Sequence, residues 1–400
     1  MKWRAALFVA AAAVWSGVTL WLCSTLYYQY IVHSCGSQAM EGGGTRVVVV
    51  SDAHMLGHRK RSTVERLWVD WQAWLSFTTI VSRRRPDLIV FLGDQFDEGT
   101  AATNNVVHKE YIARFREIFD PNVAQSLHLL GNHDAAFGPG LTAPLVGRHE
   151  REFGPANRVV NVNNVLFLQL NTMALESDVL DQQVHHDAMA YDHPPYLLCP
   201  YEVSPCPLIV SSRRFLDSVE EKRRSTGFPP LVLLTHLPLY RPDDLACGAQ
   251  RAAESGHITY EAPSFKYTER HHVLSKALSE RLLATIRPVL VLSGHSHATC
   301  AHAHRVHYQP HPVQEYTIPT FSWGMRPDPS FAILTVLDTL PTASKDDPSS
   351  VGLHLATCSL PRESHFVAVL VLAAGLHASV AWVIYSHLWP SRPLHSPRND

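Results

Sequence analysis

Short apolar runs that stop at a polar residue recur along the middle of the chain. The clearest covers residues 88–92, which end at Gly93 and are followed by Asp94. Runs of this length, bounded by glycine or polar residues, predict buried β-strands. Four other largely apolar runs have the same form, at residues 47–50, 127–130, 231–234 and 289–292.

Side chains of the metal-binding kind follow each of the five predicted strands. They are Asp52 and His54, Asp94, Asn132 and His133, His236, and His295 and His297. Because α/β folds place their chemistry beyond the carboxyl ends of strands, we expect these side chains to meet at one place. The donors are oxygen and nitrogen atoms without a thiolate, which favours manganese, iron(II) or zinc over a structural zinc–thiolate site.

Segments with helical periodicity alternate with the predicted strands. Residues 63–84 carry apolar side chains at helical spacing, among them Trp68, Trp71 and Trp74, which we interpret as core packing. The alternation predicts one layered α/β domain. Further elements are predicted at 111–119 (helix), 164–170 (strand), 274–286 (helix), and 316–318 and 331–337, two strands that complete a second sheet.

Both ends of the chain are apolar enough to cross a bilayer of about 30 Å of hydrocarbon. A cleaved signal peptide is the alternative interpretation of the first run. Basic residues outside both runs predict cytoplasmic termini and a lumenal body. The expected organisation is a transmembrane anchor at 1–28, a linker at 29–45, a lumenal domain at 46–338, a linker at 339–365, a transmembrane helix at 366–386 and a cytoplasmic tail at 387–400.

Charge and cysteine content narrow the possible partners and the compartment. The net charge is −2, with 34 basic and 36 acidic residues, so bulk charge does not indicate a nucleic-acid partner. The cysteines outside the first run form an even set, which fits an oxidising compartment. Closeness in sequence favours a Cys199–Cys206 pair, and the other pairings stay open. The set is Cys35, Cys199, Cys206, Cys247, Cys300 and Cys358.

A pair of metals needs a carboxylate that touches both, and Asp94 is the candidate. Such a pair activates water and holds the oxygens of a phosphate ester for in-line attack. His133 is then free to protonate the leaving oxygen, with Asp134 holding its ring in one tautomer. The expected ligands are Asp52, His54, Asp94 and His297 for one metal, and Asp94, Asn132, His236 and His295 for the other.

Four residues outside these motifs are candidates for substrate contacts. Arg241 and Arg326 have the guanidinium geometry that binds phosphate, although ordinary salt bridges explain them equally well. Tyr240 and Trp323 are candidates for stacking on a sugar ring, although buried packing is the commoner role of such side chains. The histidines at 302, 304, 307 and 311 are interpreted as part of a polar loop.

Taken together, the five motifs resemble those of the calcineurin-like metallophosphoesterases. Within that family, the chain is similar over residues 46–363 to the membrane enzymes that remodel the glycan of GPI anchors, through segments such as 96–99, 236–241, 319–323 and 360–363. The motifs are Ser51-Asp52-Ala53-His54, Gly93-Asp94-Gln95-Phe96-Asp97, Gly131-Asn132-His133-Asp134, Thr235-His236 and Gly294-His295-Ser296-His297.

The resemblance implies a four-layer α/β/β/α sandwich with two divalent metals, manganese being expected. It also implies removal of an ethanolamine-phosphate branch from a mannose of the GPI glycan, which promotes export of GPI-anchored proteins from the endoplasmic reticulum. The expected location is the membrane of the early secretory pathway: reticulum exit sites, the intermediate compartment and the cis-Golgi.

Other functions compatible with the motifs remain open. One alternative is hydrolysis of another phosphoester, in a nucleotide, a lipid head group or a phosphoprotein. Asp134 and Asp97 count against protein phosphatases and purple acid phosphatases, which resemblance leads us to expect to carry glutamate and tyrosine at those positions. A second alternative is a catalytically inactive adaptor for GPI-anchored cargo.

Overall fold

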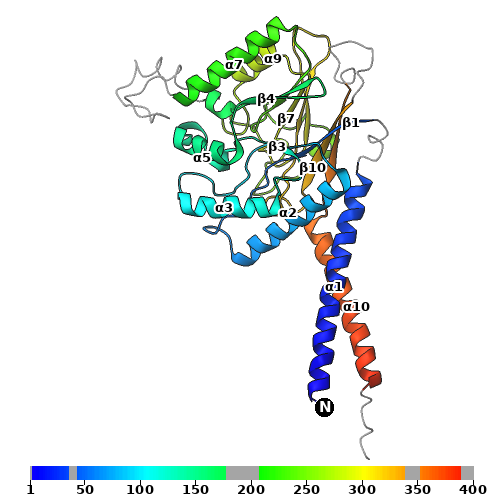
Figure 1. Cartoon of the computed structure of the whole chain (residues 1–400). Helices are drawn as coiled ribbons and strands as arrows, with labels where there is room; N and C mark the ends of the chain where they lie inside the picture. The colour runs from blue at the N-terminus through cyan, green and yellow to red at the C-terminus, as the bar shows by residue number, and fades with distance from the viewer. Residues whose placement is uncertain (1, 36–42, 177–206, 338–351, 389–400) are drawn as a thin grey trace, which may run out of the picture.

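The fold is a mixed α/β domain carried on two long terminal helices (Figure 1). It is seen in a computed structural model that describes residues 2–35, 43–176, 207–337 and 352–388. The expected Cys199–Cys206 pair lies outside these residues, as do most of 176–207 and the tail at 389–400.

The first sheet has five strands in the order β11-β10-β1-β2-β3. Strands β1, β2 and β3 are parallel, and Val50 pairs with Phe91, which pairs with His128. The three strands therefore end at the same level, so the residues that follow them emerge side by side. The strands are β1 (Gly44–Val50), β2 (Leu88–Phe91), β3 (Gln125–His128), β10 (Ser330–Leu337) and β11 (Leu353–Ser359).

The second sheet has six strands in the order β4-β5-β6-β7-β9-β8. Its four inner strands are parallel, and β4 and β8 are antiparallel strands at its edges. Leu234 pairs with Leu292, so His236 and His295 follow neighbouring strand ends. The strands are β4 (Arg158–Val162), β5 (Val165–Gln169), β6 (Leu231–Leu234), β7 (Leu290–Ser293), β8 (Cys300–His304) and β9 (Val313–Thr317).

Apolar side chains from both sheets share one buried cluster, which includes Val49, Val90, Phe167 and Leu292. Other clusters join the first sheet to α2 and α3, and the second to α5, α7 and α9. The helices of the domain are α2 (Thr63–Arg84), α3 (Asn105–Ile118), α4 (Asn132–Ala135), α5 (Ala143–Phe153), α7 (Pro207–Ser225), α8 (Ala249–Ala252) and α9 (Lys276–Ile286), with a 3-10 turn at Gly138–Gly140.

Helix α2 occupies the range that the apolar spacing predicts, and local signals explain both of its ends. The Ser62 hydroxyl accepts a hydrogen bond from the Glu65 amide at 3.2 Å, which satisfies one free donor of the first turn. Arg85 adopts a left-handed conformation at φ 45° and ends the helix. The predicted helix at 274–286 is confirmed as α9, which starts at a similar cap, Ser275.

Three predictions about the second half of the chain are wrong. Strand β10 pairs antiparallel with β1 in the first sheet and does not join β9 in the second. Strand β11 lies within 339–365, which was expected to be a linker, and forms the edge of the first sheet. Apolar alternation identifies a strand but does not specify its partner far along the chain. His302 and His304 also lie in a strand, β8, and not in a loop.

The terminal helices α1 (Lys2–Ser34) and α10 (Glu363–Leu388) pack against each other below the domain (Figure 1). Each contains a candidate membrane span by length and composition, Ala10–Ser34 and Glu363–His387. Helix α1 continues beyond the expected anchor at 1–28 into the expected linker at 29–45. A disulfide between Cys35 and Cys358 ties the end of α1 to β11.

Candidate metal centre

Five of the predicted ligands have a left-handed backbone conformation that residues other than glycine rarely adopt. Each of them follows the end of β1, β2 or β7. Such a conformation costs about 1 to 3 kcal/mol and persists where the surrounding fold imposes it, often at functional sites. The residues are Asp52 (φ 49°), His54 (φ 41°), Asp94 (φ 49°), His295 (φ 69°) and His297 (φ 56°).

Glycines beside the predicted ligands allow the chain segments to approach closely. A side chain at Gly131 would collide with the backbone and carboxylate of Asp94. A side chain at Gly93, which has φ 101°, would collide with the imidazole of His236. These two motif glycines are therefore required by the packing of the site.

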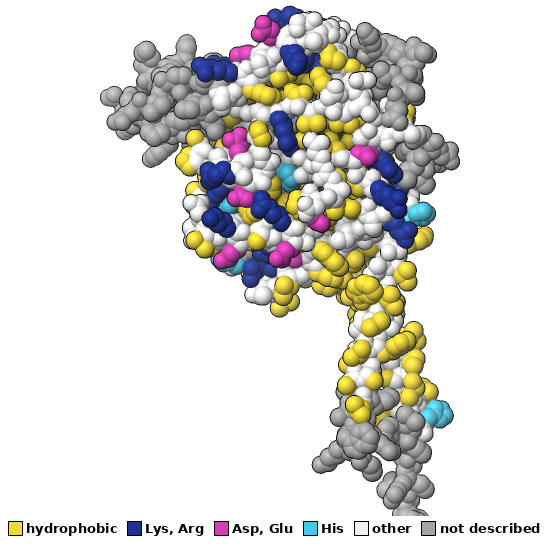
Figure 2. Space-filling model, in the orientation of Figure 1, with side chains coloured by type: hydrophobic (Ala, Val, Ile, Leu, Met, Phe, Trp, Pro, Cys, Tyr) yellow, Lys and Arg dark blue, Asp and Glu magenta, His cyan; other side chains and the backbone are white. Residues whose placement is uncertain are grey.

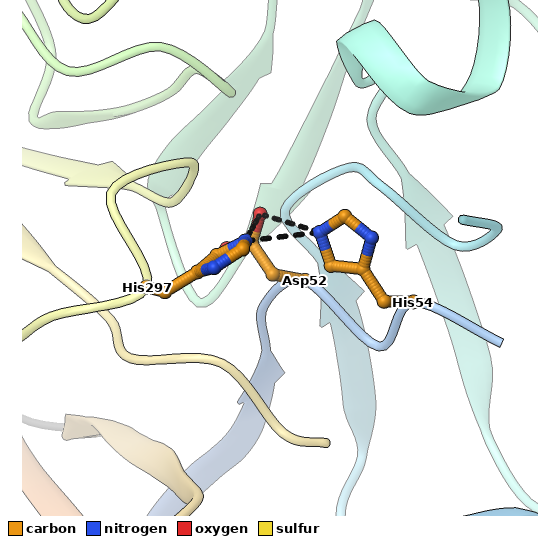
Figure 3. Close-up of side chains that lie close together, drawn as sticks. All are labelled: Asp52, His54 and His297. Carbon is orange, nitrogen blue, oxygen red and sulfur yellow. Dashed lines mark hydrogen bonds and ion pairs between the residues drawn. The ribbon is translucent and has the colours of Figure 1, made fainter. Parts of the chain in front are cut away.

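One group of donor atoms comes from Asp52, His54 and His297, which lie within 4.8 Å of one another (Figure 3). The Nε2 atoms of His54 and His297 are 3.0 Å apart. Asp52 Oδ1 lies 3.9 Å from the first and 3.8 Å from the second. All three side chains are buried, and they converge from the ends of β1 and β7.

A second group comes from Asp94, His236 and His295, also within 4.8 Å of one another. Asn132 joins it, with Oδ1 at 2.9 Å from His236 Nε2. Asp94 Oδ2 lies 3.4 Å from Nε2 of His236 and 3.4 Å from Nε2 of His54. Asp94 thus lies between the two groups, as a carboxylate shared by two metals must.

Hydrogen bonds orient the histidine rings of the two groups. Ring nitrogens of His236, His297 and His295 donate to the carbonyl oxygens of Leu92 at 2.8 Å, Thr259 at 2.7 Å and His271 at 2.8 Å. In His295 and His297 the other nitrogen keeps its lone pair for a metal, and in His236 Nε2 becomes available to one when its proton leaves. Backbone carbonyls therefore set the tautomers.

Charge states in the site suit divalent cations. Burial lowers the pKa of His54 and of His297, so both imidazoles stay neutral, the form that binds metal. Burial alone would raise the pKa of Asp94, but neighbouring histidines, His236 foremost, outweigh it and hold that pKa well below its usual range. Burial alone would lower the pKa of His236, but the charge of Asp94 outweighs it and raises this pKa to about 9. This imidazole therefore releases a proton when it binds a metal.

His133 lies beside both groups and is the more open of the central histidines, with 38% of its side chain exposed. Its Nδ1 donates to the carbonyl oxygen of Asp97 at 3.0 Å, which leaves Nε2 for another partner. Its backbone amide donates to Asp94 Oδ1 at 2.7 Å. This geometry fits a residue that exchanges a proton with a substrate.

The structure corrects the role expected of Asp134. Its carboxylate accepts the amides of Gly131 at 2.9 Å and Phe96 at 3.1 Å, and so it holds the loop. Asp97 is the acidic residue beside the His133 ring, with Oδ1 at 3.7 Å from Nδ1. Asp97 is not among the predicted site residues, although the second aspartate of Gly93-Asp94-Gln95-Phe96-Asp97 is a signal for it.

The two arginines considered for phosphate binding are buried and already paired. Arg241 Nε lies 2.7 Å from Asp244 Oδ1, and its side chain has no exposed surface. Arg326 Nη2 lies 3.0 Å from Glu254 Oε1. Because both guanidinium groups stabilise the interior, the structure corrects the phosphate-binding prediction in favour of salt bridges.

The structure also separates the two aromatic candidates. Trp323 is buried against Trp68, with ring centroids 5.3 Å apart, and its Nε1 donates to the Pro361 carbonyl at 2.9 Å, so it is not free to stack on a sugar. Tyr240 is partly exposed, and its contact with a sugar stays a prediction. Two further groups of possible donors lie among the described residues. One, of His54, Asp97 and His133, adjoins the centre; the other contains Cys247 and Cys300, which form a disulfide and are therefore not free to bind a metal.

Comparisons with known proteins agree with this geometry. Residues 45–299 match the calcineurin-like phosphoesterase family. A protein of Ailuropoda melanoleuca named Metallophosphoesterase 1 is 30% identical over 98% of this chain and 93% of its own length. Its namesake in Mus musculus is 30% identical over 86% of this chain and 78% of its own length.

Among solved structures, a dimetal phosphatase from Danio rerio, LOC 393393, is similar over 74% of this chain and 93% of its own, with a TM-score of 0.45 and 11% identity. The family match and the full-length relatives carry the assignment. The chain belongs to the calcineurin-like phosphoesterase family and is a metal-dependent phosphoesterase.

Proposed function

We propose that the protein is a membrane-anchored dimetal phosphodiesterase that removes an ethanolamine-phosphate branch from a mannose of the GPI glycan. The observation that carries the dimetal part is Asp94 Oδ2, which lies 3.4 Å from both His54 and His236. The substrate part rests on the resemblance over residues 46–363, which extends beyond the metal motifs. Manganese and the four-layer α/β/β/α order belong to the same proposal.

The residues of the chain divide the work of this reaction. The two ligand groups would hold two divalent cations, which when bound would activate a water and bind the phosphate oxygens. The water oxygen bonds to phosphorus, and the bond from phosphorus to the mannose oxygen breaks. His133 gives a proton to that departing oxygen. The Asp97 carbonyl accepts a hydrogen bond from Nδ1 of His133, so that Nε2 is the ring nitrogen that donates the proton.

The membrane and lumenal parts of the proposal rest on separate observations. The candidate spans Ala10–Ser34 and Glu363–His387 would provide two anchors. The basic residues outside them support cytoplasmic termini. The Cys35–Cys358 and Cys247–Cys300 disulfides support a domain in the oxidising lumen of the early secretory pathway. GPI-anchored proteins are the proposed partners.

Glycan analysis tests the substrate. Cells that lack the endogenous activity would express wild type, Asp94→Asn or the control Asp87→Asn, and the GPI glycans of a reporter would be analysed by mass spectrometry. Asp87 is exposed and precedes strand β2, the strand that Asp94 follows. Wild type and Asp87→Asn should remove the ethanolamine-phosphate branch, whereas Asp94→Asn should leave it in place.

Two other results would redirect the proposal. An unchanged glycan with wild type, together with hydrolysis of a generic phosphodiester, would mean another phosphoester substrate. Normal export of the reporter by Asp94→Asn with an unchanged glycan would favour the adaptor.

A further inference from the structure

Helix α2 carries on its outer surface part of the apolar spacing that was expected to pack in the core, as a stripe that the domain does not cover. The stripe begins at Val64 and continues three, seven and ten residues later with Leu67, Trp71 and Trp74, which is the spacing of one helix face. Val64 is 78% exposed, Leu67 64% and Trp74 39%. The opposite face of α2, including Ala73, Phe77 and Ile80, is buried in the core of the domain.

The stripe lies at the level where the second candidate span begins. The indole Nε1 of Trp68 donates to Glu363 Oε1 at 2.9 Å, and Glu363 is the first residue of the span Glu363–His387. Phe366, one turn further, packs against Trp68 and Trp71 with ring centroids 5.9 and 5.2 Å apart. Figure 1 shows α2 running along the base of the domain from its contact with α1.

The stripe is also continuous with the apolar surface of the terminal helices. Leu26 and Tyr30 of α1 and Val367 of α10 are exposed next to this junction. Figure 2 shows apolar side chains gathered on the two helices and at the base of the domain where they meet it. Tryptophan and tyrosine are the residues that membrane proteins concentrate at the lipid–water interface.

The acidic residues next to the stripe are neutralised by partners within the protein. Glu65 Oε1 lies 2.7 Å from Arg61 Nη1, and Asp70 Oδ2 lies 3.0 Å from Arg114 Nε. Paired carboxylates repel an anionic lipid surface less than free ones do. The charge around the stripe is therefore compatible with lipid head groups.

We propose that α2 lies in the interface of the bilayer, with Val64, Leu67, Trp71 and Trp74 among the lipids and the domain resting on it. The proposal rests on the membrane anchoring proposed above but not on the substrate. Residues 55–62 join His54 to α2, so the contact would tie the chain segment that leaves the metal centre to the lipid surface. An amphipathic helix in this position suits a phosphoester group carried on a membrane lipid or its glycan.

Lipid-dependent quenching tests the contact in the full-length chain. Single cysteines would replace Val64, Leu67, Val159 or Leu376 in a Cys23→Ser parent, be labelled with an environment-sensitive fluorophore, and be reconstituted in phosphatidylcholine nanodiscs with doxyl-labelled acyl chains. Val159 is the matched control, an exposed valine of β4 at the far end of the domain from α1 and α10 (Figure 1). Leu376 lies exposed within α10 and reports on insertion of the span itself. The unsubstituted parent gives the background labelling.

The labels at Val64, Leu67 and Leu376 should be quenched severalfold more than the label at Val159. Quenching at Leu376 with none at Val64 and Leu67 would overturn the proposal and leave the anchoring intact. This holds whether those two positions face water or are covered by a second copy or another protein. An absence of quenching at all four positions would overturn both the contact and the anchoring. Activity on a soluble phosphodiester should be unchanged in the Val64 and Leu67 variants, which separates this result from a failure of the proposed reaction.

Discussion

Asp94 Oδ2 lies 3.4 Å from His236 Nε2 in the buried centre of the domain. The same oxygen is 3.4 Å from His54 Nε2, whereas the other carboxylate oxygen accepts the backbone amide of His133 at 2.7 Å. One side chain thus faces both groups of donors and fixes the loop that carries His133. Asp94 is therefore the residue on which the proposed metal centre and the proposed reaction both depend.

The role of His133 is tested with two leaving groups. The variant His133→Gln should lower kcat by about 10²- to 10⁴-fold on a diester with an alkoxide leaving group, which needs a proton. The loss should be much smaller with p-nitrophenolate, which leaves without one. Kinetics on matched diesters, with metal content measured in parallel, check this. Equal losses on both substrates would show that His133 acts on the phosphate or the metals.

Asp134 should act on the stability of its loop and not on the tautomer of His133, which the Asp97 carbonyl sets. In Asp134→Asn the side chain has one acceptor oxygen in place of two, so the amide of Gly131 or Phe96 loses its partner, at a cost of about 1 to 3 kcal/mol. Denaturant unfolding measures this against Asp217→Asn, an exposed aspartate. If the variant kept its stability and its pH profile of kcat shifted, Asp134 would instead hold the ring of His133 in one tautomer, as the sequence suggested.

Arg241 should also be structural. Removing it in Arg241→Met leaves Asp244 Oδ1 without its arginine while Arg251 and Tyr267 still bind Oδ2, and should lower the free energy of unfolding by about 1 to 3 kcal/mol. The activity of the folded fraction should be unchanged. Unfolding and kinetic measurements, with exposed Lys276→Met as the control, check both statements. A stable variant with a raised KM would point instead to a substrate contact.

Stability should fall on acidification through His149. Burial lowers the pKa of His149 to about 4, whereas the pKa of an unfolded histidine is about 6.5. The unfolded state therefore takes up a proton first as the pH falls below about 6.5. The resulting stability is present above that pH and is lost toward pH 4, by up to about 1.4 kcal/mol per unit.

The variant His149→Gln should flatten this dependence. Free energies of unfolding at about pH 7 and about pH 5 would be compared with those of wild type and of His311→Gln, in which an exposed imidazole is removed. An unchanged slope in His149→Gln would show that this histidine does not carry the acid sensitivity.

The sequence was most informative where a strand and its ligand are neighbours in the chain. The apolar run before Asp94 predicts both β2 and the place where its carboxylate emerges, because a parallel strand buried on both faces has a local signature. The same argument placed His236 beyond β6 and His297 beyond β7. The structure brings all seven predicted ligands into the two groups.

Features that depend on distant partners were not predictable in this way. The pairing of β10 with β1 joins Val49 to Ala332, and nothing local to either strand specifies it. The buried pairing of Arg241 with Asp244 and the use of Asp134 by two backbone amides depend on how loops fold back. A charged residue beside a motif therefore suggests a substrate contact in the sequence. Only the folded structure shows whether that residue is already paired within the protein.

Metal content tests the shared role of Asp94 most directly. Wild type, Asp94→Asn and Asp87→Asn would be loaded with manganese, desalted and measured by inductively coupled plasma mass spectrometry against protein concentration. Wild type and Asp87→Asn should hold about two ions per chain, and Asp94→Asn should lose metal from both groups and hold less than about one. Two ions retained by folded Asp94→Asn, or a single ion in wild type, would contradict a carboxylate shared by two metals.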